Sequence, residues 1–449
     1  MTRRLIVTIL RLALRIYFRR VEVAGTEHVP VNGPVIFVLN HPNALVDPAF
    51  LLALAPRRVS FLAKAPLFSY PILGFFVRAL DSLPVYRQQD EGSDVSRNKD
   101  TFVVARTLLG SGGTIGICPE GVSHDEPRLR PIKTGAARMA LAAVSTGEVG
   151  DLKIVPAGLY YTSKTTFRSA ALLYFGKAIT VQRVEVDPET GEPPRVAVRE
   201  LSNAIEDALR KVILDAQHEE AWHTIARAER IFSSPHDDDQ NESLAEELEL
   251  QQRFARAYEI LQERAPDRLL KLEVRMTRFE EELRQAGVDP DELTPPTSTG
   301  EVFLTVCRRT LLFVLMLPLA ALGTVVHYPA YALGGYFSRT FSGNSEDVVS
   351  TIKIISSMLL FPATWLIAMT IGYWFGGWFL AVVPLALLPL AGFVAIRFFE
   401  ELDESIGGLR ALTFFLTRRR FFVRLLAERN AIRGEILALG KEVAAFDSP

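Results

Sequence analysis

The sequence predicts an α/β fold over about the first two hundred residues, followed by a helical region and C-terminal membrane helices. Over residues 21–196, short apolar runs alternate with helical stretches, which is typical of a sheet with flanking helices. Residues 197–296 are charged and helical in period, and residues 354–396 form an uncharged stretch of 43 positions. These three observations give a mixed sheet with flanking helices, a charged helical region and a membrane-embedded region at 297–400.

Net charge and cysteine content indicate which kinds of molecule this protein could bind. The net charge is −2 over 449 residues, so no global electrostatic attraction to nucleic acid is expected. The chain has two cysteines, Cys118 and Cys307, too few for a disulfide framework or a zinc site built from cysteines. We therefore expect membrane lipids rather than nucleic acid as the large partner, in a reducing compartment.

Residues 1–20 predict an amphipathic helix that lies on the membrane surface. The apolar side carries Leu5, Ile9, Leu12 and Ile16, and a stripe of arginines runs through Arg4, Arg11 and Arg15. This combination is typical of an interfacial helix on anionic lipid. A signal peptide is the alternative, but arginines interrupt its apolar core and no small-residue cleavage site follows.

Within 21–196 the apolar runs and helical patterns can be placed individually. We expect strands at 34–39, 58–63, 82–86, 114–118, 153–160 and 171–176, and helices at 45–55, 67–79, 98–110 and 134–146. The turn-forming run from Asp187 to Pro194 is expected to close this domain.

The charged region at 197–296 predicts solvated helices that pack on the core or on each other, with a break at 233–239 and a linker from Pro290 to Pro296. It contains His218 and His223, which could suggest a zinc-protease helix. Such a helix needs histidines four residues apart, whereas a separation of five places them about 140° apart around the helix. No metal site is expected here.

The membrane-embedded region contains three apolar segments. Residues 310–337 are interrupted by Pro318, Gly323 and Pro329. Residues 354–396 as one helix would be about 65 Å long, twice the hydrocarbon core of a bilayer. We therefore expect a hairpin of segments 354–375 and 377–396 that turns at Gly376 and Gly377.

Positive charge predicts the orientation. The basic C-terminal segment at 401–449, the pair Arg308 and Arg309, and the arginine-rich N-terminus should all lie on the cytoplasmic side, together with the α/β domain. Flanks on one side require an even number of crossings, so 310–337 would be re-entrant or interfacial. Three spans remain the alternative.

The stretch from Asn40 to Pro48 is the first candidate for chemistry. His41 follows the apolar run 35–39 directly, and Asp47 comes six residues later. The carboxyl ends of strands are where α/β folds place their chemistry. A His with an Asp nearby can remove a proton from a hydroxyl. The alternative is a loop His and an Asp that caps a helix.

Three further polar islands follow at strand ends. The second is Arg87, which alone could be an ordinary surface arginine. The third begins at Pro119, Glu120 and Gly121, where glycine allows a ligand to approach the backbone closely. It continues through the candidate substrate-binding residues Ser123, Arg128 and Lys133 to a helix start near Thr134, a plausible anion site. The fourth is Pro156 in a buried strand.

In this order, the four islands resemble the motifs of the glycerolipid acyltransferase family over about residues 30–180. The sequence departs from the commonest pattern in having His-x5-Asp in place of His-x4-Asp, Cys118 in place of Phe, and Val122-Ser123-His124-Asp125 in place of Thr-Arg-Ser. The longer spacing, the Ser-His-Asp, and Phe167-Arg168-Ser169 with Phe175-Gly176 are similar to the fungal-type glycerol-3-phosphate/dihydroxyacetone-phosphate branch, which also carries a C-terminal membrane region.

The resemblance implies an integral membrane acyltransferase. It would move an acyl group from acyl-CoA or acyl-carrier protein to the sn-1 hydroxyl of glycerol 3-phosphate, dihydroxyacetone phosphate, or both. His41 would be the general base and Asp47 its orienting acid. Arg87 would bind the acceptor phosphate with Lys133 or Arg128, Glu120 and Gly121 would shape the acceptor pocket with Ser123 beside them, and Pro156 would help form the acyl-side wall. No cofactor or metal is expected beyond the acyl donor.

Several alternatives stay open. Within the class, the chain could be a lysophosphatidate or other lysophospholipid acyltransferase. From other classes, a non-catalytic lipid-binding scaffold and a metal-dependent lipid hydrolase are possible. His124 could be a second acid or base or a phosphate ligand, or a loop residue that completes a turn beside Asp125.

Overall fold

The structure is a computed structural model. It describes residues 2–87, 90, 94–126, 128–187, 189–215, 219–232, 243–290, 293, 299–343 and 345–446. Three expectations concern residues wholly or partly outside these ranges: the break at 233–239, the linker at 290–296, and His218 of the histidine pair. The chain forms two compact units. The first comprises 1–217, 243–248 and 338–354, and the second comprises 218–242, 249–337 and 355–449.

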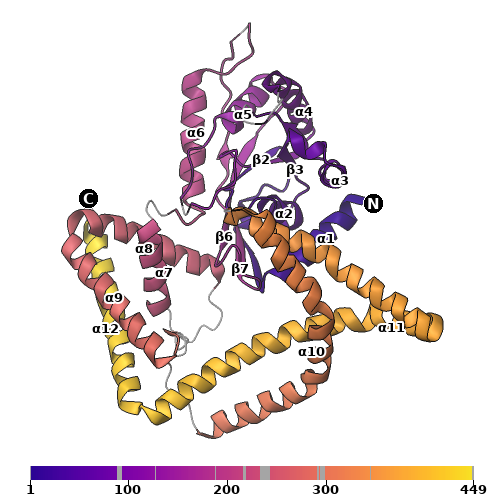
Figure 1. The fold of residues 1–449 in the computed structure, drawn as a ribbon. Helices are drawn as coiled ribbons and strands as arrows, with labels where there is room; N and C mark the ends of the chain where they lie inside the picture. Colours follow the sequence, from indigo (N-terminus) through magenta and orange to yellow (C-terminus); the bar gives the residue numbers. More distant parts are fainter. Residues whose placement is uncertain are drawn as a thin grey trace. The chain divides into compact units, whose positions relative to one another are not determined.

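The first unit is built on an eight-stranded mixed sheet of order β1-β7-β6-β2-β5-β3-β4, with β8 paired to β6 (Figure 1). The strands are β1 Arg20–Ala24, β2 Val35–Leu39, β3 Ser60–Lys64, β4 Leu83–Val85, β5 Thr114–Ile117, β6 Lys153–Tyr161, β7 Ala170–Phe175 and β8 Ile179–Thr180. β6 runs antiparallel to β7 and β8, and the other pairs are parallel. The predicted α/β class and its six strands are confirmed; the polar, alternating β1 and the two-residue β8 were not predicted.

Helices cover both faces of this sheet. They are α1 Thr2–Tyr17, α2 Val46–Leu54, α3 Pro71–Ala79, α4 Asn98–Gly110, α5 Gly135–Ser145 and α6 Arg195–Arg210. Side chains alternate along β2, so that Ile36 and Val38 pack in a core with α4, α5 and α6, whereas Val35, Phe37 and Leu39 pack with α1 and α2. Burial on both faces explains why this strand is a continuous apolar run.

The predicted helix at 67–79 begins later than expected. Residues Ala65–Phe68 form a 3₁₀ turn, and α3 starts at Pro71, whose fixed φ suits the first helical position. The other three predicted helices of the domain agree with α2, α4 and α5 to within one residue at each end.

The apolar side predicted for the N-terminal helix is exposed on α1: Leu5, Ile9, Leu12 and Ile16 are 62%, 39%, 58% and 41% exposed. The opposite face is buried and held by arginines. Arg3 donates to the carbonyl of Val59 at 2.6 Å, and Arg11 donates to the carbonyl of Ala53 at 2.6 Å. These two arginines therefore bind the α/β domain itself, while the apolar side is left without cover in the protein.

The second unit is helical. Its helices are α7 Glu219–Phe232, most of α8 Leu244–Arg264, α9 Pro266–Ala286, α10 Thr299–Phe341, α11 Val349–Thr417 and α12 Arg419–Phe446. The charged helices pack on each other: Arg275 of α9 donates to Glu428 at 2.7 Å and to Glu435 at 2.8 Å on α12. Arg429 is buried and donates to the carbonyls of Ile231 and Pro290 at 3.0 and 3.1 Å.

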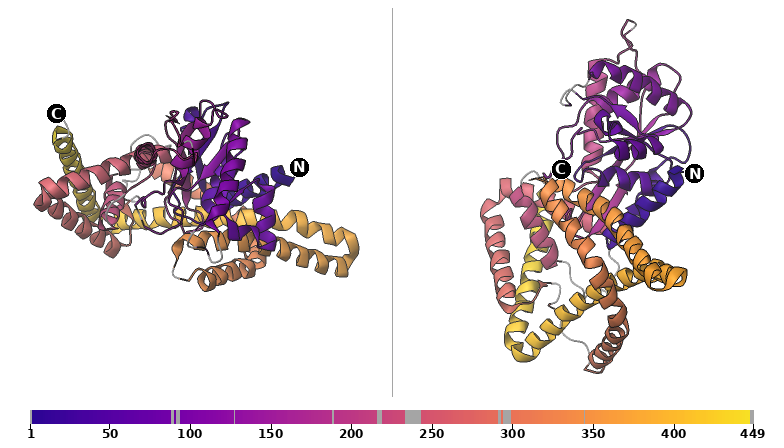
Figure 2. Two further views of the ribbon diagram at one scale, coloured as in Figure 1. Left: turned by 90° about the horizontal axis from the view of Figure 1, so that it is seen from above. Right: turned by 45° about the vertical axis from the view of Figure 1, so that its right-hand side comes forward.

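Among the described residues, α10 and α11 are long and apolar enough to cross a membrane, and few of their residues are buried in the protein. α10 stays helical through Pro318 and Pro329. α11 reverses at Gly376 and Gly377, the two positions predicted for the turn, where Gly377 has the positive φ of 64° that favours glycine. Figure 2 shows the two arms of α11 side by side. The number of membrane crossings stays a prediction.

Asn40 extends the pairing between β2 and β6 beyond the end of β2. Its side-chain amide donates to the carbonyl of Leu159 at 3.0 Å, and its carbonyl oxygen accepts from the N–H of Leu159 at 2.7 Å. Asn40 is 9% exposed, so these groups have little access to water. The side chain thus takes the place of one more ladder residue and fixes where the following loop begins.

We predict that Asn40→Ala destabilises the first unit by about 2 kcal/mol, because it leaves a buried N–H and a buried carbonyl of Leu159 unpaired. Thermal melting of the detergent-solubilised protein should show a lowered Tm. Val31→Ala is the control, since Val31 is 85% exposed and its truncation should leave Tm unchanged. Equal melting temperatures for the two variants would contradict this account of Asn40.

Candidate active site

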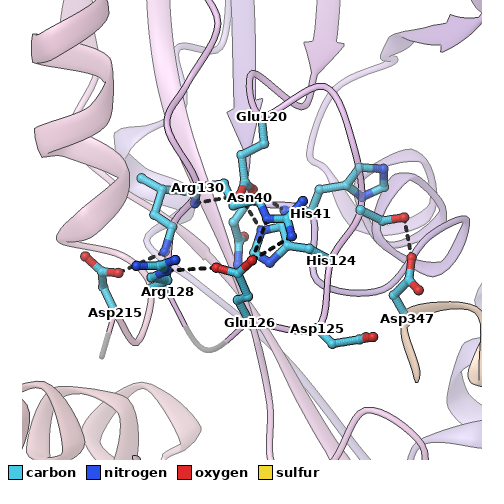
Figure 3. A network of polar contacts seen from close by, with 12 residues as sticks. Asn40, His41, Glu120, His124, Asp125, Glu126, Arg128, Arg130, Asp215 and Asp347 are labelled. Atoms are coloured by element: carbon cyan, nitrogen blue, oxygen red, sulfur yellow. Dashed lines mark hydrogen bonds and ion pairs between the residues drawn. The ribbon is translucent and has the colours of Figure 1, made fainter. Parts of the chain in front are cut away.

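The polar loops after β2 and β5 leave the sheet side by side. The two strands are parallel neighbours with Val38 opposite Ile117, so both chains end at the same edge. The backbone N–H of His124 donates to the carbonyl of His41 at 3.2 Å and ties the second loop to the first. Figure 3 shows Asn40, His41, Glu120 and His124 gathered at this edge. The structure therefore brings the first and third polar islands together, as parallel strands require.

His41 and Asp47 are in direct contact. Nδ1 of His41 lies 2.9 Å from Oδ2 of Asp47, and the Asp47 side chain is fully buried. The same carboxylate accepts a hydrogen bond from the backbone N–H of Asn43 at 2.7 Å and one from the hydroxyl of Tyr161 at 2.7 Å. Three donors surround this carboxylate, which stabilises its ionised form in the interior and fixes the orientation of the imidazole.

The His-x5-Asp spacing is accommodated by a tight turn before α2. The carbonyl of Asn43 accepts from the N–H groups of Val46 and Asp47 at 2.9 and 3.3 Å, and Ala44 has a φ of 29°. α2 begins at Val46, so Asp47 lies in its first turn, where a carboxylate is favoured by the helix dipole. The longer spacing thus brings Asp47 to His41 through the loop and the helix start, and not along one face of a helix.

Charge states follow from burial and from these contacts. Burial disfavours the imidazolium of His41, but the hydrogen bond to Asp47 and the charge of that carboxylate favour it, and they hold the pKa of His41 above its usual value. Burial, together with the nearby Asp47, raises the pKa of Tyr161, so its hydroxyl remains a donor. Burial also raises the pKa of Cys118, which keeps it a neutral thiol beside His41 at neutral pH.

Glu120 organises the loops around His41. It is 2% exposed, and its Oε1 accepts from the backbone N–H of His41 at 2.8 Å. Its Oε2 accepts from Nε2 of His124 and from the backbone N–H of Arg130 at 3.0 Å. Glu120 was predicted to shape the acceptor pocket. Its contacts place it in the wall of the site, where it holds the backbone that carries His41.

His124 is a buried partner of Glu120. Besides that bond and its backbone bond to His41, its Nδ1 has no hydrogen-bond partner among the described residues. The bond to Glu120 uses Nε2, and Nδ1 is buried away from solvent. These contacts favour the interpretation of His124 as a residue that completes the turn, and they tie this turn to the loop that carries His41.

Arg87 lies against the third island through Gly121. Its Nη1 donates to the carbonyl of Gly121 at 2.7 Å, while Nε and Nη2 form a bidentate pair with Asp90 at 3.0 and 2.7 Å. Gly121 has a φ of 76°, and a Cβ at this position would lie 2.7 Å from Nζ of Lys133. Hydrogen bonding to Arg87 lowers the pKa of Asp90, and the charges of Lys64 and Lys133 add to this.

Arg87, Lys64 and Lys133 therefore form a cationic cluster around one carboxylate, that of Asp90. Such a cluster has the charge and the donors needed to bind a phosphate. The cluster includes two of the residues predicted to bind the acceptor, Arg87 and Lys133. Lys64 was not predicted, although its position at the end of a predicted strand is the same signal that identified Arg87.

Ser123 and Arg128 form other contacts. The hydroxyl of Ser123 donates to the carboxylate of Asp347, and Arg128 donates to Glu126 at 2.7 Å. Hydrogen bonds from Arg128 and Arg130 lower the pKa of Glu126 to about 2. The structure thus pairs Arg128 with an acidic neighbour and Ser123 with a distant segment, and their role in substrate binding stays a prediction.

Sequence reasoning missed other residues of the site. Tyr161 could have been found, because it directly follows the predicted strand 153–160 and ends the observed β6 at the same sheet edge as His41. Asn43 is fully buried, and neither polar atom of its side chain has a partner among the described residues, which nothing in its sequence context indicates. Asp347 and Thr351 reach the site from more than two hundred residues away in the chain and carry no local signal.

Two family profiles match the chain. The family described as Acyltransferase matches residues 20–160, and the family described as Glycerol-3-phosphate acyltransferase 2 C-terminal domain matches residues 224–444. The first match contains all four polar islands and the described contacts of His41 with Asp47 and Glu120. The second contains most of the second unit, including α10 and α11.

Curated relatives agree with these profiles. Glycerol-3-phosphate O-acyltransferase 1 of Saccharomyces cerevisiae is 26% identical over 80% of this chain and 57% of its own length. Glycerol-3-phosphate O-acyltransferase 2 of the same yeast is 26% identical over 59% of this chain and 37% of its own length. Human 1-acyl-sn-glycerol-3-phosphate acyltransferase alpha is 30% identical over 28% of this chain and 44% of its own length. The chain thus spans only about half the length of the two yeast relatives.

A solved structure, that of the 1-acyl-sn-glycerophosphate acyltransferase of Thermotoga maritima, is similar over 47% of this chain and 79% of that one, with a TM-score of 0.34 and 18% identity. This likeness is too low to carry an argument. The sheet order, the His–Asp pair at its carboxyl edge and the matched profiles define the class without it: an acyltransferase domain joined to a helical domain with apolar helices. The chain thus carries an acyltransferase domain followed by a domain of the kind described as Glycerol-3-phosphate acyltransferase 2 C-terminal domain, and it is similar in sequence to the two yeast glycerol-3-phosphate O-acyltransferases.

We predict that Asp47→Asn lowers the pKa of His41. The carboxylate favours the imidazolium, so its loss favours the neutral ring, which then persists to lower pH. Diethyl pyrocarbonate modifies neutral histidine, and peptide mass spectrometry can follow the reaction at His41 as a function of pH. The midpoint should move to lower pH in the variant.

The exposed His223 of the same protein is the internal control, because it lies outside the contacts of Asp47. Its midpoint should not change. If the midpoint for His41 were also unchanged, or moved to higher pH, the Asp47 carboxylate would not be setting the charge of His41.

Proposed function

We propose that this protein is a membrane-bound O-acyltransferase. It transfers a fatty acyl group from acyl-CoA or acyl-carrier protein to the sn-1 hydroxyl of glycerol 3-phosphate, dihydroxyacetone phosphate, or both, in phospholipid synthesis. The observation that carries this proposal is the contact of His41 with Asp47, whose carboxylate is buried and accepts two further hydrogen bonds. A base held in this way is suited to activating a hydroxyl.

In the proposed mechanism the neutral form of His41 reacts. Asp47 occupies Nδ1, so Nε2 takes the proton from the acceptor hydroxyl, and the raised pKa of the ring makes this neutral form a stronger base. The oxygen attacks the thioester carbonyl and forms a tetrahedral intermediate. This intermediate collapses by breaking the carbon–sulfur bond, and the thiolate takes the proton back from His41. The products are the acyl ester and the free thiol. Cys118 stays a neutral thiol next to the ring and forms no covalent intermediate.

The acceptor phosphate would bind the cationic cluster. Arg87 holds Asp90 with two parallel hydrogen bonds, the same geometry with which a guanidinium holds a phosphate. The phosphate would take the place of the Asp90 carboxylate and gain the charges of Lys64 and Lys133, as well as the close approach that Gly121 permits. The carbonyl of Gly121, which accepts from Arg87, keeps the guanidinium beside the third island.

A membrane location suits this chemistry, because the acceptor and the acyl donor are soluble anions whereas the product is a lipid. The exposed apolar side of α1 is suited to binding a bilayer surface, and the helices α10 and α11 are long and apolar enough to cross a bilayer. We propose that the α/β domain lies on the cytoplasmic face, on the side of Arg308, Arg309 and the basic C-terminal segment.

A lysophosphatidate acyltransferase is the second candidate within the class, because the human relative named above is a 1-acylglycerol-3-phosphate acyltransferase. The two reactions share the base and the phosphate site and differ in whether the acceptor already carries an acyl chain. The acylation assay described next also distinguishes both candidates from a non-catalytic scaffold and from a metal-dependent hydrolase.

We predict that the purified protein in phospholipid micelles converts radiolabelled glycerol 3-phosphate and acyl-CoA into labelled 1-acylglycerol 3-phosphate, with no loss of activity in EDTA. His41→Ala should lower kcat by about 10²- to 10⁴-fold, because it removes the general base. His223→Ala is the control and should retain activity. Acylation of lysophosphatidate alone would favour the second candidate. Release of fatty acid from lipid that the chelator abolishes would favour the hydrolase, and no conversion of either acceptor would favour the scaffold.

We predict that Arg87→Lys raises the KM for glycerol 3-phosphate by about tenfold and changes the KM for acyl-CoA little, since a lysine keeps the charge but loses the bidentate geometry. Arg128→Lys is the matched comparison, because Arg128 is 59% exposed and paired with Glu126. Steady-state kinetics with each substrate varied in turn measures both constants. Equal effects of the two substitutions would contradict the assignment of the phosphate to Arg87.

A further inference from the structure

The segment between α10 and α11 belongs to the first unit, although the helices on either side lie mostly in the second. We call residues 338–354 the connector. Several of its polar side chains are buried, among them Asp347, Ser350 and Thr351, which are 6%, 0% and 9% exposed. Buried polar groups in native proteins almost always have partners, so the location of those partners indicates what the connector does.

The first contact is at the start of α2. Leu45 precedes this helix and has no polar side chain to cap it. The carbonyl of Asn43 accepts from the N–H groups of Val46 and Asp47, so the N–H of Leu45 needs another partner. The N–H of Leu45 donates to the hydroxyl of Thr351 at 3.2 Å. Since Asp47 lies in the first turn of α2, Thr351 fixes the end of the helix that orients His41.

The second contact is with the loop after β5. The hydroxyl of Ser123 donates to the carboxylate of Asp347, and the N–H of Glu346 donates to the carboxylate of Asp125 at 3.0 Å. Ser123 and Asp125 flank His124, which bonds both Glu120 and the backbone of His41. The connector therefore holds this loop on both sides of a residue that contacts the base loop.

The third contact is with the turn between β6 and β7. The hydroxyl of Ser350 donates to the carbonyl of Lys164, and Nζ of Lys353 donates to the carbonyl of Thr165 at 2.8 Å. Lys164 in turn donates to the carbonyl of Asp125 at 3.1 Å. Burial lowers the pKa of Lys164, while Asp125, Asp47, Glu346 and Asp347 oppose this shift, so one cation balances acidic groups of the connector and of the site.

We propose that the connector is a positioning element of the active site, with Thr351 and Asp347 as positioning residues that act through Leu45 and Ser123. Three loops that end at the same sheet edge have the connector as a shared partner, and both of its ends continue into helices suited to a bilayer. The connector thus links the conformation of the loop that carries His41 to the two apolar helices. Its effect on turnover rests on the acyltransferase function proposed above.

The test uses the full-length protein in nanodiscs of phosphatidylcholine with phosphatidylglycerol. Thr351→Val removes the hydroxyl and keeps the shape, Thr351→Ser restores the hydroxyl, and Thr107→Val, on the exposed side of α4, is the matched control. Thr351→Val should lower kcat for glycerol 3-phosphate acylation by roughly 10- to 100-fold, with the KM for acyl-CoA nearly unchanged, because misplacement of a base affects the chemical step. Thr351→Ser should recover most of the activity.

A second pair of variants tests Asp347. Asp347→Asn and Ser123→Ala should each lower kcat, and the double variant should be no worse than the more affected single variant, since each breaks the same contact. Asp403→Asn, on the exposed surface of α11, is the matched control and should retain activity. Additive losses in the double variant would overturn the assignment of Asp347.

Hydrogen exchange gives a readout that does not require activity. Amides of residues 40–48 should exchange faster in Thr351→Val than in wild type or in Thr107→Val, at unchanged melting temperature. If this exchange is unchanged and kcat is retained, the connector is passive packing and the inference is wrong. If wild type acylates no acceptor but exchange at 40–48 still responds to Thr351→Val, the proposed function fails and the positioning role stands.

Discussion

A carboxylate that is nearly excluded from water is stable only where donors surround it, and the structure satisfies this condition for Glu120 with three of them. The backbone N–H of His41, the ring of His124 and the backbone N–H of Arg130 all converge on it. The loop after β2 and the loop after β5 are therefore held by one side chain. Loss of the carboxylate would leave several buried N–H groups unpaired at once, so the position of His41 depends on Glu120 as much as on its own strand.

Asp47 meets the same condition independently, with donors from His41, Asn43 and Tyr161. Two buried carboxylates thus coexist at one sheet edge, because each has its own set of hydrogen-bond donors. The result is a division of roles. Glu120 holds the backbone of the two loops, and Asp47 holds the imidazole ring of His41 at Nδ1. The separation follows from the sheet, since Asp47 comes from α2 after one strand and Glu120 from the turn after its neighbour.

Local pattern was sufficient to predict six of the eight strands, the paired His41 and Asp47, and the cation at Arg87, because each of these depends on residues close in sequence. The local pattern did not predict which residues these side chains would pair with. Nothing near Arg87 indicates that Asp90 would pair with it, and Arg11, which was expected to belong to a stripe facing lipid, instead donates to a backbone carbonyl of the α/β domain. Tyr161 was within reach of the argument, but Asp347 was not: its contact with Ser123 joins residues 224 positions apart.

The contact of Asp347 with Ser123 shows that the acyltransferase domain needs residues from outside 20–160. Residues 20–160 contain the motifs, but the apolar layer under β2 also packs against Ile354, and the pair Leu244 and Leu248 packs with Tyr160 and Leu172 at the far strands. A chain ending before these segments would leave the N–H of Leu45 and the carboxylate of Asp125 without their protein partners and would expose apolar surface. The fold around His41 therefore needs residues that follow α10 in the chain. The α/β domain is complete only when the apolar helix α10 has also been synthesised.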